Sequence, residues 1–213
     1  EQVRDLLDAA YDLDDCSRAV TCLEASMGDD PEYDYLINLA IAYTLDDQPQ
    51  SALDTLNRAA AATDSVEAQI DIERLMLTVQ HPEFEHRFAE LSDIVEAGNS
   101  PSDSDLDFLE TVLEQAPTYS DAYVVLGRAY LQLDDTDAAL EVLLDGQKRL
   151  GDLPDIIDLL AQALWESDEE ALAIDYLNKG LEVDPNHVPL LVRTGLYLFQ
   201  NNQFDDAKIY LAR

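Results

Sequence analysis

The chain has 213 residues, of which 47% are hydrophobic, so it can bury a sizeable core in one elongated domain or in two shorter ones. Its charge is extreme, because 46 acidic residues stand against 12 basic ones and the formal net charge at pH 7 is −34. This balance excludes nucleic acids as partners and disfavours anionic membrane surfaces, since binding either needs clusters of lysine and arginine that the sequence lacks.

The first 64 residues are predicted to form two helical hairpins. Apolar side chains between positions 6 and 23 recur at helical spacing on both sides of the turn DLDD. The second hairpin runs from Tyr33 to about Thr63. Its second helix begins at Pro49, where the missing N–H costs nothing, and ends in the alanine-rich stretch RAAAAT, which has high helix propensity.

Residues 65–117 are predicted to be an irregular helical segment containing a divergent repeat. We expect three helices, with the sequences VEAQIDIERLMLTVQ, EFEHRFAELSDIVEA and DLDFLETVLEQA, separated by the His81-Pro82 break and by the loop GNSPSDS. The second and third of these helices are interpreted as one hairpin with a lengthened loop, which leaves residues 66–80 as an extra helix.

Residues 118–213 contain three repeats in register, and the last of them is truncated. The repeats start at Ser120, Pro154 and Val188, and each is 34 residues after the one before. A small residue and a leucine return at this period, namely Ala139, Ala173 and Ala207 and then Leu143, Leu177 and Leu211. A period of this length is typical of helical hairpin repeats.

The pattern resembles the tetratricopeptide repeat family. That family places large residues at positions 4, 11 and 24, small residues at 8, 20 and 27, and proline at 32. The repeat that starts at Ser120 meets the first six of these positions with Tyr123, Gly127, Tyr130, Ala139, Leu143 and Gly146. The resemblance implies an all-α fold, a right-handed superhelical solenoid of antiparallel helical hairpins with a concave face.

The small residues have a mechanical explanation. Two helices approach to roughly 8 to 10 Å only where the facing side chains are small. We therefore expect Gly127 and Ala139 to be the contact points within their hairpin.

No motif in the sequence indicates catalysis, a cofactor or a metal. Asp103, Asp105, Asp107 and Glu114 match a calcium-binding loop, but Phe108 occupies the position where its sharp turn needs glycine, and helical periodicity continues through the segment. An acidic helix N-terminus is the preferred interpretation. We expect no metal site, no cofactor and no enzymatic activity in this chain.

The resemblance also implies which side chains line the concave groove. In the family, ligands are held by positions 2, 5, 9, 12 and 13 of each first helix. The family's subgroup that grips a C-terminal carboxylate through lysine and asparagine is not matched, because Val124, Asp158 and Val192 stand at position 5. Carried onto this sequence, the positions predict a partner-binding groove lined by Ile37, Ile41, Thr44, Val124, Arg128, Leu131, Asp155, Asp158, Gln162, Trp165, Val192, Leu196 and Phe199.

A protein-interaction scaffold or adaptor is therefore the predicted function, with a protein or peptide partner that carries apolar anchors and basic flanks. Trp165 and Phe199 are the candidate hot spots, with packing against a neighbouring repeat as the alternative role for Trp165, Leu131 and Phe199. The alternatives from other classes are a substrate-positioning repeat domain of a larger enzyme, such as a glycosyltransferase, and a self-associating assembly module that would make a homo-oligomer.

The charge and the cysteines bear on where the protein works. The acidity fits either attraction of a basic partner or a solvated surface adapted to a salt-rich cytoplasm, and intact folding in low salt would remove support for the second. Cys16 and Cys22 lie about 9 Å apart along a predicted helix, too far for a disulfide, which favours a reducing, cytoplasmic location. A periplasmic or secreted location stays open because the chain starts at Glu1 as if cut from a longer protein.

The sequence predicts no transmembrane helix. The most apolar stretch, LINLAIAYTL, is too short to span a bilayer, which takes roughly 20 residues.

Overall fold

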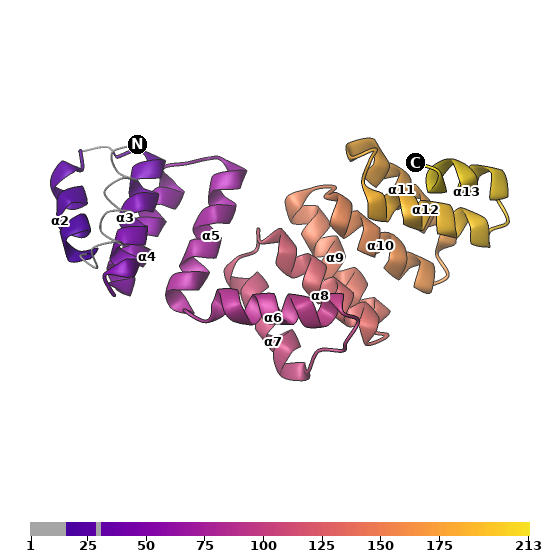
Figure 1. Cartoon of the computed structure of the whole chain (residues 1–213), viewed down its shortest axis with the longest axis horizontal. Helices are drawn as coiled ribbons and strands as arrows, with labels where there is room; N and C mark the ends of the chain where they lie inside the picture. Colours follow the sequence, from indigo (N-terminus) through magenta and orange to yellow (C-terminus); the bar gives the residue numbers. More distant parts are fainter. Residues whose placement is uncertain (1–15, 29–30) are drawn as a thin grey trace. The chain divides into compact units, whose positions relative to one another are not determined.

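The structure, a computed structural model, describes residues 16–28 and 31–213, and the statements below concern these residues (Figure 1). Their regular structure is α-helical throughout, as the sequence predicts. The first helix of the predicted N-terminal hairpin lies outside the described residues. The helices are α2 (Cys16–Ser26), α3 (Tyr33–Leu45), α4 (Pro49–Ala61), α5 (Val66–Gln80), α6 (Phe84–Glu96), α7 (Asp103–Gln115), α8 (Ser120–Gln132), α9 (Thr136–Leu150), α10 (Pro154–Glu166), α11 (Glu170–Val183), α12 (Val188–Gln200) and α13 (Phe204–Leu211).

The chain divides into two compact units, residues 1–87 and residues 88–213, and the division falls inside α6. In unit 1 the hairpin of α3 and α4 packs against α2 on one side and against α5 on the other. Leu36, Leu56 and Ile72 are almost completely buried in this core. The sequence-based division at residues 64 and 117 stays a prediction.

Unit 2 contains the three predicted hairpins, α8 with α9, α10 with α11, and α12 with α13. Consecutive hairpins pack on each other, so that α10 contacts α8, α9 and α12. The main core of the unit is centred on α10, where Ile156, Ile157 and Leu160 are fully buried. This nearest-neighbour packing is what a 34-residue repeat produces.

The turn inside each hairpin of unit 2 returns with the same period as the helices. Asp134, Asp168 and Asn202 have positive φ angles of 59°, 62° and 61°, and they follow one another at the repeat period. The next residue donates its backbone N–H five residues back, as in the bond from Glu169 to the carbonyl of Leu164 at 2.9 Å. This is a Schellman motif in which Asp or Asn takes the left-handed position that glycine usually fills.

The predicted role of the small residues is confirmed. A Cβ atom added at Gly127 would lie 2.5 Å from Cδ2 of Leu143, and one at Gly195 would lie 2.5 Å from Cγ of Leu211. The leucine of the second helix therefore packs directly over the glycine backbone of the first. Ala139 is fully buried in the same hairpin.

The three helices predicted between residues 65 and 117 are present as α5, α6 and α7. The calcium-loop alternative is not formed, because α7 is helical from Asp103 onward and its first turn is capped. The backbone N–H of Ser102 donates to the Asp105 carboxylate at 3.0 Å. Among the described residues, no helix is both long enough and apolar enough to cross a membrane.

Candidate functional site

The predicted groove residues are distributed over both units, and only those of unit 2 are brought together in a shared arrangement. In unit 1, Ile37 and Ile41 lie half-buried on α3, and Ile37 packs against the core of that unit. Thr44 is exposed, and its hydroxyl donates to the carbonyl of Ala40 at 2.9 Å. The remaining ten residues lie on α8, α10 and α12.

Two rows of side chains run across α8, α10 and α12. Within each row, one residue follows the next after 34 positions of the chain. Position 5 of each repeat supplies Val124, Asp158 and Val192, and position 9 supplies Arg128, Gln162 and Leu196. We call these six residues the first-helix face. On α8 this face has one apolar and one charged residue. On α10 both of its residues are polar, and on α12 both are apolar.

A pocket of about 380 Å³ opens within unit 2, between the end of α6 and the helices α8, α10 and α12. Three of the predicted groove residues, Arg128, Leu131 and Gln162, line it. The sequence analysis did not assign α6 or Arg193 to the groove. For α6 a signal was present, because this helix was interpreted as the first helix of a hairpin, and first helices line the groove. The lining residues are Val95, Glu96, Arg128, Leu131, Gln132, Leu159, Gln162 and Arg193.

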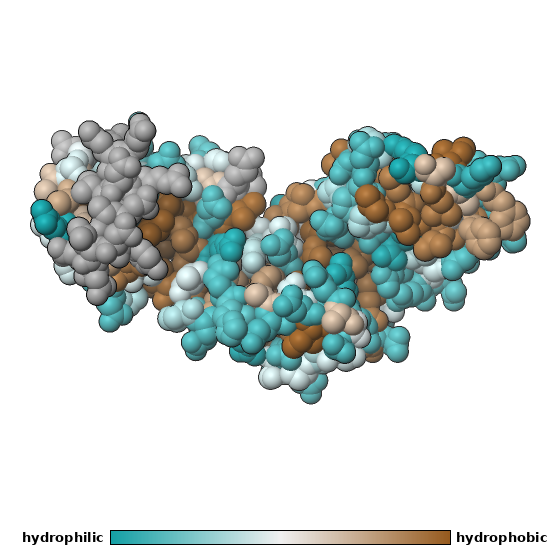
Figure 2. Space-filling model, in the orientation of Figure 1, coloured by the Kyte–Doolittle hydropathy of each residue, from teal (hydrophilic) through white to brown (hydrophobic). Residues whose placement is uncertain are grey.

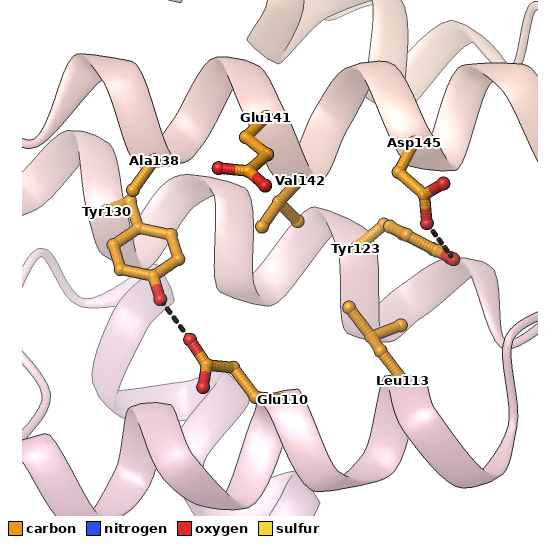
Figure 3. Close-up of a pocket in the computed structure, with 8 residues that line it drawn as sticks. All are labelled: Glu110, Leu113, Tyr123, Tyr130, Ala138, Glu141, Val142 and Asp145. Carbon is orange, nitrogen blue, oxygen red and sulfur yellow. Dashed lines mark hydrogen bonds between the residues drawn. The ribbon is translucent and has the colours of Figure 1, made fainter.

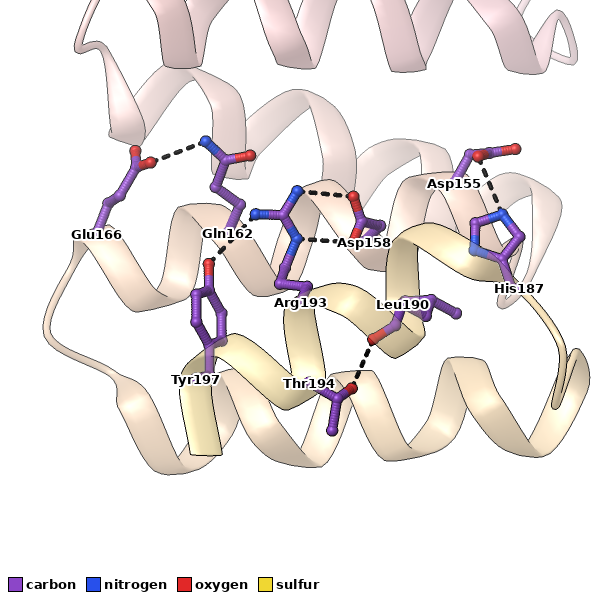
Figure 4. Close-up of polar contacts among 9 residues, drawn as sticks. All are labelled: Asp155, Asp158, Gln162, Glu166, His187, Leu190, Arg193, Thr194 and Tyr197. Carbon is purple, nitrogen blue, oxygen red and sulfur yellow. Dashed lines mark hydrogen bonds and ion pairs between the residues drawn. The ribbon is translucent and has the colours of Figure 1, made fainter. Parts of the chain in front are cut away.

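Asp158 is held by Arg193, which comes from the next repeat (Figure 4). Nε and Nη2 of Arg193 donate to the two carboxylate oxygens at 2.6 and 2.8 Å, and Asp158 is only 6% exposed. Burial lowers the pKa of the Arg193 guanidinium, but the hydrogen bonds and the charge of Asp158 outweigh this effect and raise that pKa overall. The charge of Asp158 is therefore satisfied within the protein, by an arginine that lines the pocket.

Trp165 packs against the neighbouring repeat. Its ring stacks on that of Tyr197 with centroids 3.8 Å apart and planes 17° apart, and it borders the core of unit 2. Leu131, at the same repeat position, is buried. Trp165 and Leu131 therefore take part in packing within unit 2, which was the alternative role considered for them.

Phe199 differs from Trp165, although it occupies the same repeat position. It is 55% exposed and makes an edge contact with Phe204, with centroids 5.2 Å apart. The two phenylalanines line a separate hollow of about 330 Å³ on α12 and α13. Figure 2 shows that apolar side chains gather over these two helices.

The other predicted groove residues of unit 2 differ in how far they are exposed. Val124 is half-buried against the core of unit 2. Asp155 is exposed and lies 3.2 Å from Nε2 of His187. Val192 and Leu196 are 45% and 49% exposed, so they are available for contact on the first-helix face.

A second pocket, of about 290 Å³, lies between α7, α8 and α9 and was not predicted (Figure 3). The hydroxyl of Tyr130 donates to Glu110 at 2.5 Å, and that of Tyr123 donates to Asp145 at 3.3 Å. Burial and the Glu110 carboxylate raise the pKa of Tyr130. These tyrosines stand at positions 4 and 11 of their repeat, so their internal bonds serve the packing of α8 between its neighbours.

The first-helix face is chemically mixed. It offers half-exposed apolar side chains, one amide group and one guanidinium, and its one carboxylate is already paired. Within the part of the chain that the structure describes, no group of three His, Cys, Asp or Glu side chains could hold a metal ion.

Comparison with known proteins identifies the repeats. Three family models described as tetratricopeptide repeats match residues 4–67, 106–163 and 154–187. A curated relative, the formate-dependent nitrite reductase complex bifunctional subunit NrfFG of Haemophilus influenzae, is 29% identical over 106 residues. That match covers 48% of this chain and 28% of the relative, so the aligned part is a small fraction of that protein.

Two solved structures resemble the chain in fold. MamA from Desulfovibrio magneticus RS-1 aligns with 17% identity and a TM-score of 0.47, covering 88% of this chain and 94% of the other. TTC0263, a thermophilic tetratricopeptide repeat protein of Thermus thermophilus, aligns with 21% identity and a TM-score of 0.42, covering 93% of this chain and 98% of the other.

Proposed function

The chain belongs to the tetratricopeptide repeat family, and on this basis we propose that it is a non-catalytic interaction module that binds a segment of a partner protein along the first-helix face. The observation that carries the proposal is the pocket of about 380 Å³ to which α6, α8, α10 and α12 all contribute. Such a hollow, made by successive repeats, accommodates a segment longer than any one helix can contact.

The partner segment is expected to combine apolar anchors with basic flanks. Val192 and Leu196 present adjacent apolar surface on α12, where an aliphatic or aromatic anchor gains from burial. The net charge of −34 attracts lysine and arginine in the flanks and speeds their approach at low salt. The alternative origin of the acidity, solvation in a salt-rich cytoplasm, predicts unfolding on dialysis into low salt.

Selection from a display library of random twelve-residue peptides tests the proposal even though the partner is unidentified. The immobilised chain is expected to enrich peptides with apolar and basic residues. The double variant Val192→Ser, Leu196→Ser is expected to lose them, because it removes the apolar surface of α12. Its matched control is Leu144→Ser, Leu172→Ser, which removes two leucines of similar exposure, 44% and 42%, from the second helices α9 and α11.

The outcomes separate clearly. Enrichment that the α12 variant loses and the control variant keeps supports binding at the first-helix face. Enrichment that both variants keep places the binding elsewhere, and a library from which nothing is enriched contradicts the proposed function.

A second candidate function is partner positioning inside an enzyme complex. The match over 106 residues to NrfFG, named as a subunit of a nitrite reductase complex, favours it. Cross-linking in cells that produce the protein, followed by mass spectrometry, tests this candidate. Cross-links from the first-helix face to an enzyme subunit would support it, and cross-links confined to non-enzymatic proteins would contradict it.

A further inference from the structure

The pocket between α7, α8 and α9 has an unbalanced set of charges (Figure 3). Among the described residues that line it there are three carboxylates, of Glu110, Glu141 and Asp145, and no basic side chain. One cation reaches this set from outside, because Nε of Arg149 donates to Asp145 at 2.6 Å. Glu141 is exposed and makes no hydrogen bond or ion pair with any residue that the structure describes. We call this hollow of about 290 Å³ the Tyr130 pocket.

The two carboxylates that are bonded to tyrosines can still accept further hydrogen bonds. Glu110 accepts the hydroxyl of Tyr130 at 2.5 Å, and Asp145 accepts that of Tyr123 at 3.3 Å. Because a carboxylate has two oxygens and about four acceptor sites, these bonds do not saturate it. Burial raises the pKa of Tyr130, and the Glu110 carboxylate raises it further, as expected where the potential is negative.

The next repeat, 34 residues along the chain, lacks this arrangement. At the positions of Glu110, Tyr123, Tyr130 and Asp145 it has Leu144, Ile157, Leu164 and Lys179. The general acidity of the chain would favour carboxylates equally in both repeats. The carboxylates and hydroxyls of the Tyr130 pocket are therefore a local feature of this one repeat.

In the next repeat the chain supplies a cation of its own at the equivalent place. Nζ of Lys179 lies 4.7 Å from the centroid of the Tyr176 ring, in a cation–π contact. Tyr176 and Lys179 are the equivalents of Val142 and Asp145, which both line the Tyr130 pocket. One repeat thus holds an internal ammonium group where the other has a carboxylate beside a hollow, and a cation from another molecule would complete the second arrangement.

We propose that the Tyr130 pocket binds the side chain of a lysine or arginine from a partner protein. The aliphatic stem of such a side chain packs against Leu113 and Val142, which are half-buried, and the carboxylates receive its charged head. Among the described residues, no three acidic groups are placed to hold a metal ion, which favours an organic cation. No residue of the first-helix face lines this pocket, so it is a second contact surface and does not rest on the proposed function.

The test is an NMR titration of the 213-residue chain with blocked amino acids. The probes are Nα-acetyl-lysine methylamide and Nα-acetyl-arginine methylamide, and the reference is Nα-acetyl-norleucine methylamide, which keeps an aliphatic stem without the charge. With either cationic probe we expect a saturable shift of the ring signals of Tyr123 and Tyr130. Shifts spread evenly over the ten tyrosines, no shift at all, or an equal response to the norleucine derivative would overturn the proposal.

Two variants of equal charge separate the pocket from the net charge of the chain. Glu141→Gln is expected to weaken binding of the lysine derivative by about 2- to 5-fold, the range of an exposed ion pair. Asp175→Asn removes an exposed carboxylate at the equivalent position of the next repeat and is expected to change binding little. Equal weakening by the two variants, or none by Glu141→Gln, would contradict the assignment, since only the net charge would then matter.

A third variant changes the shape of the pocket and keeps its charge. Ala138 lines the pocket, and its equivalent in the next repeat is Leu172, so Ala138→Leu introduces a side chain that this repeat position accepts. We expect the variant to lose the saturable shift at Tyr130, while its circular dichroism and melting temperature stay close to those of wild type. Unchanged binding by Ala138→Leu would place the cation outside the pocket and refute the proposal.

Discussion

Asp158 on α10 and Arg193 on α12 join two successive repeats through a bidentate ion pair of 2.6 and 2.8 Å. Removing one partner of a buried pair leaves an uncompensated charge, so Asp158→Ala is expected to destabilise the chain by about 3 to 5 kcal/mol. Urea unfolding followed by circular dichroism measures this loss. The double variant Asp158→Leu, Arg193→Leu is expected to recover most of it, and a double variant less stable than Asp158→Ala would contradict this account.

Trp165 and Tyr197 report on the same junction between repeats. Their rings stack at 3.8 Å, and Trp165 is the single tryptophan of the chain, so its fluorescence is specific to this place. Tyr197→Ala is expected to uncover the indole, because the stacked ring is removed. The measurement is acrylamide quenching together with the emission maximum, and we expect stronger quenching and a red shift. Tyr210→Ala, on α13, serves as the control, and identical quenching in both variants would exclude the stacked arrangement.

Gly127 has no room for a larger side chain. Since an added Cβ atom would already lie 2.5 Å from Leu143, Gly127→Leu is expected to overpack the hairpin of α8 and α9 and to cost about 1 to 3 kcal/mol. Thermal melting checks this expectation. Gly28→Leu is the control, because no atom of the residues that the structure describes lies within 4 Å of a Cβ atom added there. A melting temperature of Gly127→Leu equal to that of wild type would refute the close contact.

Arg74 and Glu85 connect α5 to the beginning of α6. Nε and Nη2 of Arg74 each donate to the Glu85 carboxylate at 2.8 Å, and this hydrogen bonding lowers the pKa of Glu85 against the opposing effect of burial. A carboxyl group with a lowered pKa contributes stability above its unfolded-state pKa, and this contribution is lost as the pH falls through the folded-state value. The side chains are about half exposed, so the effect on stability is expected to be small, below about 1 kcal/mol.

NMR titration of the Glu85 carboxyl carbon gives the sharper measurement. Arg74→Gln is expected to move the pKa of Glu85 upward, because the charge and one donor are lost. A titration curve that Arg74→Gln leaves unchanged would show that the lowered pKa has another origin.

Much of the fold could be predicted because the repeat signal is local. Gly127, Ala139 and Leu143 return with their equivalents every 34 residues, and this period predicted the hairpins of unit 2 and the contact between glycine and leucine. The helices of residues 65–117 were also predicted from their apolar periodicity. The turns were less evident, because Asp134 and Asp168 take a left-handed conformation that sequence patterns associate with glycine.

The candidate site could be predicted from the sequence only in part. The resemblance to the tetratricopeptide repeat family was enough to assign side chains to positions 5, 9 and 12 of each first helix. The partners of those side chains came only from the folded arrangement: Arg193 neutralises Asp158, Tyr197 covers Trp165, and Arg128 has no partner among the described residues. Arg193 and Tyr197 belong to the next repeat, more than thirty residues along the chain, and their contacts depend on how two helices are rotated against each other. A pattern along one helix contains no information about that rotation.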